Sequence, residues 1–255
     1  MDDTKEKSKW TRFREKVLNL IFPMHIKCIF CDEELSEEGH NDTCFECQQI
    51  LPYIIGGCPK CGDLVRDGAV ICDKCKAQNR DFDQAKAVFM YKDEIVNVVH
   101  KLKYENLKFL AEPIAKHMCE LYATWGIDAD IVTSVPLHKN KEKSRKFNQA
   151  KEIAKEICKV FDLRYEDLCE KVLDNPSQTT LTYKQRQENV KSAYSVVREK
   201  RKLIKDKTIM LVDDVFTTGA TANELSRILK EAGAKAVFVL TFAHSVIENE
   251  EEKDG

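Results

Sequence analysis

The stretch that decides the fold runs from Thr208 to Thr221 and reads TIMLVDDVFTTGAT. It opens with the apolar run 209–212, which is typical of a strand buried on both faces of a parallel sheet. Two acids, Asp213 and Asp214, follow at the carboxyl end of this strand, and a loop rich in hydroxyl groups comes next. A helical pattern with apolar residues on one side follows the loop. The order strand, acids, loop and helix predicts an α/β domain with a parallel sheet.

The loop after the acids has the groups needed to bind a phosphate. Its backbone N–H groups and hydroxyls are suited to an anion, and the helix start adds the positive end of its dipole. Gly219 lets the backbone turn sharply and approach the anion. Ionised carboxylates only accept hydrogen bonds, so an adjacent pair suits the 2′- and 3′-hydroxyls of a ribose. The expected phosphosugar site consists of Asp213, Asp214, Thr217, Thr218, Gly219, Ala220 and Thr221. The segment is not a Walker loop, because no lysine follows the glycine. The competing interpretation is an ordinary strand–loop–helix turn with two solvated acids.

Length and composition indicate one soluble globular domain with a small additional module. The chain has 255 residues, of which 43% are hydrophobic and 33% charged. The net charge of −2 does not predict nucleic-acid binding, so any basic surface must be local. No apolar run approaches the roughly 20 residues that a membrane helix needs. The first residues include acids and lack the apolar core of a signal peptide, so we expect a cytoplasmic protein.

Eight of the eleven cysteines form four CxxC pairs, a spacing typical of metal knuckles in a reducing compartment. They are Cys28, Cys31, Cys44, Cys47, Cys58, Cys61, Cys72 and Cys75. Two such pairs close one tetrahedral thiolate cage, so four predict two structural zinc sites. Sequential pairing puts the first four cysteines on one ion, and a crossed arrangement is the alternative. A redox dithiol is the competing idea. The region 28–75 has few large apolar residues, so we expect metal to carry its folding.

The chain divides by pattern into four segments. Residues 1–22 alternate charges with an apolar stripe and predict an amphipathic helix, which docks on the body of the protein or on a membrane or partner. Residues 23–80 make up the zinc module and 81–247 the main domain. The acidic tail 248–255 is expected to be disordered.

A second anion site is expected after a strand at 130–135. The strand leads into a basic loop, KNKEKSRK, and a helix begins at about Phe147. Arg145 lies beside that helix start, whereas the individual lysines also fit a solvated charge run. A long polar connection at 174–194 is typical of a functional or disordered loop.

These segments together resemble the ComF family of competence proteins. The 208–221 string is similar to the PRPP-binding motif of type I phosphoribosyltransferases, where PRPP is phosphoribosyl pyrophosphate. The resemblance covers nearly the whole chain: the cysteine knuckles, HKLKY at 100–104, VPLH at 135–138, RKFNQ at 145–149 and VDDVFTTGAT. The family usually has glycine in the RKFNQ segment where this chain has Lys146. The family's double zinc ribbon matches all four cysteine pairs.

The main domain is also similar to the phosphoribosyltransferase domain of amidophosphoribosyltransferases. This resemblance implies a pyrophosphate loop within 135–149 and a flexible loop at 178–194. It implies pyrophosphate contacts from Val135, Pro136, Leu137, His138 and Lys139, and catalytic roles for Arg145, Gln178 and Arg186. No glutaminase domain is recognisable, so amination fed by glutamine is not expected.

The implied reaction is displacement at the anomeric carbon of PRPP, with Mg²⁺ lowering the charge of the pyrophosphate. The alternatives are a PRPP-binding adaptor without chemistry and a single-stranded DNA binder that uses the ribbon and the basic loops. Expected partners are PRPP, single-stranded DNA and a competence helicase or another DNA-uptake protein.

Overall fold

A computed structural model describes residues 26–36, 39–65, 69–173 and 193–245. Two compact units make up the chain, a shorter one of residues 1–50 and a longer one of residues 51–255. The expected N-terminal helix and the acidic tail lie outside the described residues. The domain boundary expected near residue 80 stays a prediction.

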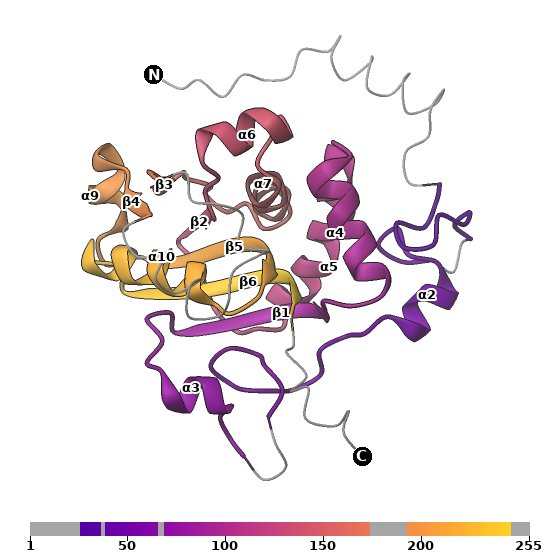
Figure 1. The fold of residues 1–255 in the computed structure, drawn as a ribbon, viewed down its shortest axis with the longest axis horizontal. Coiled ribbons are helices and arrows are strands. Elements are labelled where there is room, and N and C mark those ends of the chain that lie inside the picture. Colours follow the sequence, from indigo (N-terminus) through magenta and orange to yellow (C-terminus); the bar gives the residue numbers. More distant parts are fainter. Residues whose placement is uncertain (1–25, 37–38, 66–68, 174–192, 246–255) are drawn as a thin grey trace. The chain divides into compact units, whose positions relative to one another are not determined.

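The longer unit is built on a four-stranded sheet in the order β1-β6-β5-β2, with all neighbouring strands parallel (Figure 1). The strands are β1 (Gln84–Met90), β2 (Ile131–Ser134), β5 (Thr208–Phe216) and β6 (Ala236–His244). A separate antiparallel pair consists of β3 (Cys169–Lys171) and β4 (Tyr194–Val196). The predicted α/β class with a parallel sheet is confirmed.

Seven helices of the longer unit and two 3₁₀ turns are described. They are α3 (Asp73–Ala77), α4 (Glu94–Tyr104), η1 (Lys108–Leu110), α5 (Ala111–Ala123), α6 (Lys139–Arg145), α7 (Gln149–Phe161), η3 (Arg198–Lys200), α9 (Arg201–Ile204) and α10 (Ala220–Glu231). The shorter unit contains α2 (Phe45–Ile50). Among the described residues, no helix combines the length and the apolar character needed to cross a bilayer.

The central strand β5 is covered on both faces, as its apolar run predicted. Residues 209–212 have no exposed surface. Ile209 and Leu211 share a buried cluster with Leu225 and Leu229 of α10. Neighbouring residues of a strand point to opposite faces, so Met210 and the other alternate residues point to the face that α5 and α7 cover. The fixed strand brings its carboxyl end to one edge of the sheet, where parallel sheets usually bind ligands.

Candidate functional site

The acids lie inside β5 rather than after it, because the strand continues to Phe216. β2 ends at Ser134, opposite Val212, so β5 extends past its neighbour by the residues that include Asp213 and Asp214. The expectation that the strand ends before the acids is therefore wrong. The consequence is that the two carboxyl groups are held by a hydrogen-bonded strand and not by a loose loop.

The loop from Thr217 to Gly219 joins β5 to α10, and its geometry requires glycine. Gly219 has φ +74°, and a Cβ added there would lie 2.5 Å from Cζ of Phe216. The buried hydroxyl of Thr218 accepts a hydrogen bond from the backbone N–H of Ala220 at 3.3 Å. Beyond this contact, the N-terminal cap residue Gly219 has no side chain with which to cap α10. Its first turn therefore offers backbone N–H groups and a dipole end beside the hydroxyl loop.

A lysine from α4 provides the counter-charge for the two acids, of which Asp214 is buried and Asp213 is half-buried. The Nζ atom of Lys103 lies 2.8 Å from Oδ2 of Asp214, and both side chains are mostly buried. Burial favours the neutral form of Asp214, but the ammonium of Lys103 outweighs this effect and lowers the pKa of Asp214. Burial and the neighbouring charge of Asp214 raise the pKa of Asp213 well above its ordinary value. Burial lowers the pKa of Lys103, and Asp214 raises it by more, so that Lys103 stays charged.

The segment after β2 leaves the same edge of the sheet. Val135 is buried and its N–H donates to the carbonyl of Val212 at 3.0 Å. Residues 139–145 form α6, so the expectation of a basic loop is wrong. The helix begins where Nδ1 of His138 accepts a hydrogen bond from the N–H of Asn140. The predicted pyrophosphate residues thus lie on a short connection and on the first turn of a helix.

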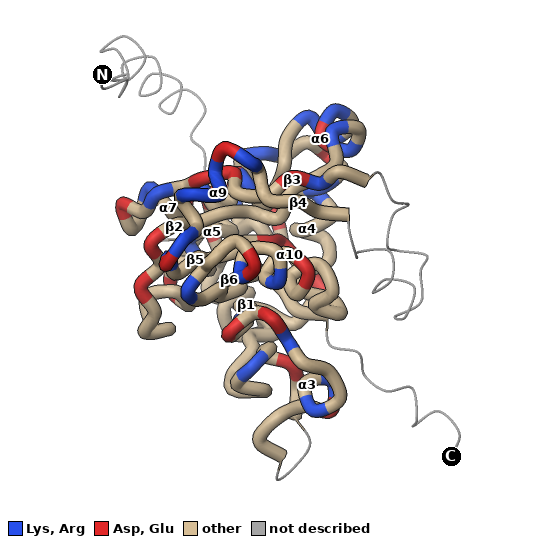
Figure 2. Tube along the Cα trace, turned by 90° about the vertical axis from the view of Figure 1, so that its left-hand side faces the viewer, with Lys and Arg blue, Asp and Glu red and all other residues tan. Residues whose placement is uncertain are grey.

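Helix α6 is rich in lysine and arginine and contains one acid, Glu142 (Figure 2). Its basic residues are Lys139, Lys141, Lys143 and Arg145, and Lys146 follows. The guanidinium carbon of Arg145 lies 5.1 Å from the centre of the Tyr104 ring, and this arginine also lowers the pKa of Asp214. The ends of α4 and α6 enclose a pocket of about 510 Å³, which is lined by Lys103, Tyr104, Glu105, Asn106, Lys141, Ser144, Arg145 and Lys146. The pocket is therefore suited to an anion.

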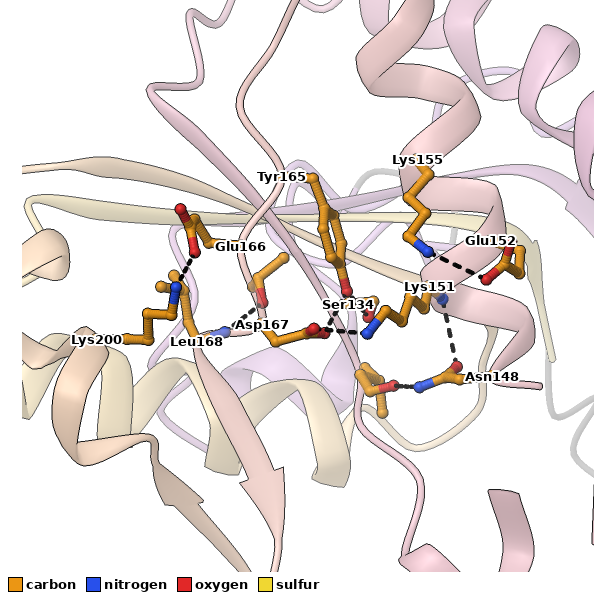
Figure 3. Close-up of polar contacts among 12 residues, drawn as sticks. Ser134, Asn148, Lys151, Glu152, Lys155, Tyr165, Glu166, Asp167, Leu168 and Lys200 are labelled. Atoms are coloured by element: carbon orange, nitrogen blue, oxygen red, sulfur yellow. Dashed lines mark hydrogen bonds and ion pairs between the residues drawn. The ribbon is translucent and has the colours of Figure 1, made fainter. Parts of the chain in front are cut away.

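The RKFNQ segment is fixed by hydrogen bonds to the base of the connection (Figure 3). Asn148 is the N-terminal cap of α7: its Oδ1 accepts a hydrogen bond from the N–H of Lys151, and its Nδ2 donates to the carbonyl of Val135 at 3.0 Å. Lys146 has φ 66° and ψ −14°, the left-handed conformation that glycine adopts without strain. Lys146 thus has a backbone conformation that suits glycine, the residue that the ComF family usually has at this position.

A second set of contacts in the same view holds the end of β2 (Figure 3). The hydroxyl groups of Ser134 and Tyr165 lie 2.9 Å apart, and the hydroxyl of Tyr165 donates to Asp167 at 2.7 Å. Lys151 donates to the other carboxylate oxygen of Asp167 at 2.6 Å. This network ties α7 to the strand end from which the connection leaves.

Gln178 and Arg186 lie outside the described residues. Tyr194, at the end of the same connection, starts β4 and is buried. Burial and the charge of Asp213 raise the pKa of Tyr194, and a hydrogen bond with Thr221 opposes this rise. Asn148 and Tyr194 are site residues that the sequence reasoning did not assign, and for Lys103 its contact with Asp214 was not foreseen. Their only signal was membership of the HKLKY and RKFNQ segments, or of the polar connection.

The first cysteine group lies in the shorter unit and contains Cys28, Cys31, Cys44 and Cys47. Its four Sγ atoms lie within 4.8 Å of one another. The Sγ atoms of Cys31 and Cys44 are 3.7 Å apart. Sulfurs placed about 2.3 Å from a tetrahedral zinc ion are about 3.8 Å apart, whereas a disulfide needs about 2.05 Å. This group therefore fits zinc and not disulfides.

The second group, Cys58, Cys61, Cys72 and Cys75, has the same geometry, with 3.6 Å between the sulfurs of Cys61 and Cys72. The structure thus favours sequential over crossed pairing. This group is part of the main core: three of its cysteines share the buried cluster with Phe82 and Leu225. The expectation that metal carries the folding of 28–75 needs correction for this group, because core residues of the sheet domain also pack against its cysteines.

Comparisons with known proteins agree with this architecture. A family model described as phosphoribosyl transferase domain matches residues 148–254. Competence protein F of Haemophilus influenzae is 26% identical over 235 residues, which are 87% of this chain and 98% of that protein. Competence protein ComFC of Bacillus subtilis is 26% identical over 239 residues, 84% of this chain and 92% of that protein. The predicted resemblance to the ComF proteins is thereby confirmed.

Among solved structures, the chain is similar to glutamine phosphoribosylpyrophosphate amidotransferase from B. subtilis complexed with ADP and GMP. The sequence identity is 19% and the TM-score 0.37, over 56% of this chain and 30% of that one. The family match and the parallel sheet together identify a type I phosphoribosyltransferase domain in the longer unit.

Proposed function

We propose that this relative of the ComF competence proteins, which carries a type I phosphoribosyltransferase domain, binds PRPP and transfers its phosphoribosyl group to an acceptor. The observation that supports this most directly is the arrangement at the end of β5. Two acids on a fixed strand are followed by a hydroxyl loop that a helix N-terminus closes. A ribose 5′-phosphate matches that order of groups, because its 2′- and 3′-hydroxyls suit the acids and its phosphate suits the loop and the helix start.

Each part of PRPP has a proposed partner in this arrangement. Asp213 and Asp214 accept hydrogen bonds from the ribose hydroxyls. The loop from Thr217 to Gly219, together with Ala220 and Thr221 of the first turn of α10, holds the 5′-phosphate. Arg145 and the connection from Val135 to Lys139 face the pyrophosphate. Gln178 and Arg186, which lie outside the described residues, are proposed to act from a loop that excludes water from the reacting carbon.

Mg²⁺ is the proposed cofactor, and the donor set fits it. Mg²⁺ prefers oxygen ligands, retains several waters and is usually held jointly by carboxylates and substrate phosphates. Asp213 and Asp214 are the carboxylates that would hold the ion, through the ribose hydroxyls. When bound, the ion lowers the charge of the pyrophosphate. In the transfer, the bond from the anomeric carbon to pyrophosphate breaks and a bond to the acceptor forms. The two cysteine groups are proposed to hold structural zinc.

Pyrophosphate release from PRPP tests this proposal. The assay contains Mg²⁺ and a panel of bases, amines and single-stranded DNA, and an Asp213→Asn/Asp214→Asn variant runs beside the wild type. Release that needs one acceptor and both acids is the expected result. Absence of release above the variant, with every acceptor, would contradict transfer. If PRPP still bound tightly in that case, the protein would be an adaptor that senses PRPP.

A second candidate function is binding of single-stranded DNA, which the basic residues of α6 favour. Backbone phosphates bind basic side chains in a salt-dependent manner. A competence helicase or another DNA-uptake protein in the cytoplasm is the proposed partner. DNA affinity that falls steeply with salt, and that falls further when Lys141 and Lys143 are replaced by glutamine, would support this function. Affinity insensitive to both would refute it.

A further inference from the structure

Two helices end at the anion pocket, and their last residues contact each other. Tyr104 is the last residue of α4, and Arg145 is the last residue of α6. Both side chains line the pocket of about 510 Å³ that is proposed to receive the pyrophosphate. Tyr104 is 60% exposed, so packing in the core does not account for its place. Its position at the wall of the pocket points to a role in the pocket itself.

The Tyr104 side chain contacts the guanidinium of Arg145 in two ways. The guanidinium carbon lies 5.1 Å from the centre of the ring, within the range of a cation–π contact. Nη2 of Arg145 also lies 3.5 Å from the hydroxyl oxygen, a distance at which a hydrogen bond is weak. The ring therefore supplies most of the interaction. The ring is itself restrained, because it meets the ring of His100, one turn earlier on α4, with 4.9 Å between the centroids.

An aromatic ring restrains an arginine without neutralising its charge. A free arginine side chain has many rotamers, and fixing it before the ligand arrives lowers the entropy that binding must remove. A carboxylate in the place of the ring would also fix the guanidinium, but it would compete with the pyrophosphate for the same N–H groups. Among the described residues Arg145 forms no ion pair, and Tyr104 is the side chain that contacts its guanidinium.

We propose that Tyr104 is a positioning residue for the reaction: its ring holds Arg145 where the guanidinium meets the pyrophosphate of PRPP. The inference rests on the proposed function of Arg145. A guanidinium fixed in this way can bind two phosphate oxygens at once. The neighbouring Lys141 and Lys146, which also line the pocket, add charge on flexible side chains but no comparable geometry.

The test measures the binding of two ligands by calorimetry in the presence of Mg²⁺. Inorganic pyrophosphate probes the pocket. Ribose 5-phosphate probes the two acids and the phosphate loop, because it has the diol and the 5′-phosphate but no pyrophosphate. Tyr104→Leu removes the ring, and Tyr104→Phe removes the hydroxyl alone. Phe109→Leu is the matched control, because Phe109 of η1 is also an exposed ring but does not line the pocket. Melting curves check that these exposed substitutions leave the fold intact.

Tyr104→Leu is expected to weaken pyrophosphate binding by about two- to fivefold, the factor that corresponds to an exposed cation–π contact. Tyr104→Phe should keep most of the wild-type affinity, and Phe109→Leu should match the wild type. Ribose 5-phosphate should bind equally to all four proteins. The inference is overturned if Tyr104→Leu binds pyrophosphate as the wild type does, if Tyr104→Phe loses as much as Tyr104→Leu, or if both ligands lose affinity by the same factor.

The variant Arg145→Gln shows whether Tyr104 acts through this arginine. In that background Tyr104→Leu should have no further effect on pyrophosphate affinity, because the contact is already absent. A further loss as large as that in the wild-type background would refute the positioning role.

A PRPP titration of the wild type separates this inference from the proposed function. Pyrophosphate binding that depends on Tyr104 and Arg145, without any binding of PRPP, would refute the proposed function and leave the role of Tyr104 intact. A wild type that binds no pyrophosphate would overturn the role of Tyr104, whether or not PRPP binds.

Discussion

Replacing Gly219 by alanine tests the claim that the phosphate loop is packed against the strand that precedes it. The new Cβ would lie 2.5 Å from Cζ of Phe216. The ring has little freedom to move away, because it is stacked on His244 with centroids 4.9 Å apart and meets Phe82 edge-on at 5.9 Å. The φ of +74° adds the cost of a left-handed conformation. We therefore expect two separate penalties.

Gly126→Ala separates these penalties. Gly126 also has φ +74°, but nothing lies within 4 Å of its added Cβ. In both variants the left-handed conformation of the new alanine lowers the unfolding free energy by about 1–2 kcal/mol. Only in Gly219→Ala does overpacking lower it further, by about 1–3 kcal/mol. Both also share the small gain from a less flexible unfolded chain. The difference between the variants is thus expected to be about 1–3 kcal/mol.

The assay is urea unfolding followed by circular dichroism, together with PRPP titration. Gly219→Ala should lose more unfolding free energy than Gly126→Ala and should bind PRPP more weakly. Adding Phe216→Leu should recover part of the loss, since a smaller side chain makes room for the methyl group. Equal destabilisation by the two alanines, together with unchanged PRPP affinity, would refute the packing argument.

Three further changes test the rest of the site. Lys146→Gly should raise the unfolding free energy by about 1 kcal/mol, since it relieves a left-handed residue; a loss of stability would contradict the conformation at φ 66°. The folded pKa of Asp213 is raised, so the stabilisation from its proton is lost as the pH rises above 3.8. The melting temperature of Asp213→Asn should therefore exceed that of the wild type by a margin that grows with pH. A melting temperature below that of the wild type near neutrality would contradict the raised pKa of Asp213. Cys58→Ser should lower the main unfolding transition and the zinc content, whereas Cys31→Ser should lower the zinc content alone, because only Cys58 shares the main core. Equal shifts of the transition would argue against this difference.

The sheet was predictable from the sequence because its strands are buried on both faces. Continuous apolar runs, at 209–212 and 236–240, are typical of such strands, and both lie in β-strands. The helix expected from about Phe147 is α7, which starts at Gln149. The cysteine groups were predictable because thiolate spacing is local in the sequence.

One missed feature is local, and the others depend on tertiary contacts. The basic stretch after β2 was expected as a loop, but it has good helix formers and an N-terminal cap from His138, and it forms α6. The ion pair between Lys103 and Asp214 joins residues far apart in the chain, and no local pattern indicates it. The same holds for the second cysteine group, whose packing against Phe82 and Leu225 depends on the completed sheet.

The central claim is that Asp213 and Asp214 form the sugar site of a PRPP-binding protein. The most direct test is a calorimetric titration of PRPP with Mg²⁺ into the wild type and into the Asp213→Asn/Asp214→Asn variant, with circular dichroism as the check on folding. The account predicts one binding site per chain in the wild type and no measurable heat of binding in a folded variant. Equal affinities in the two proteins would contradict it.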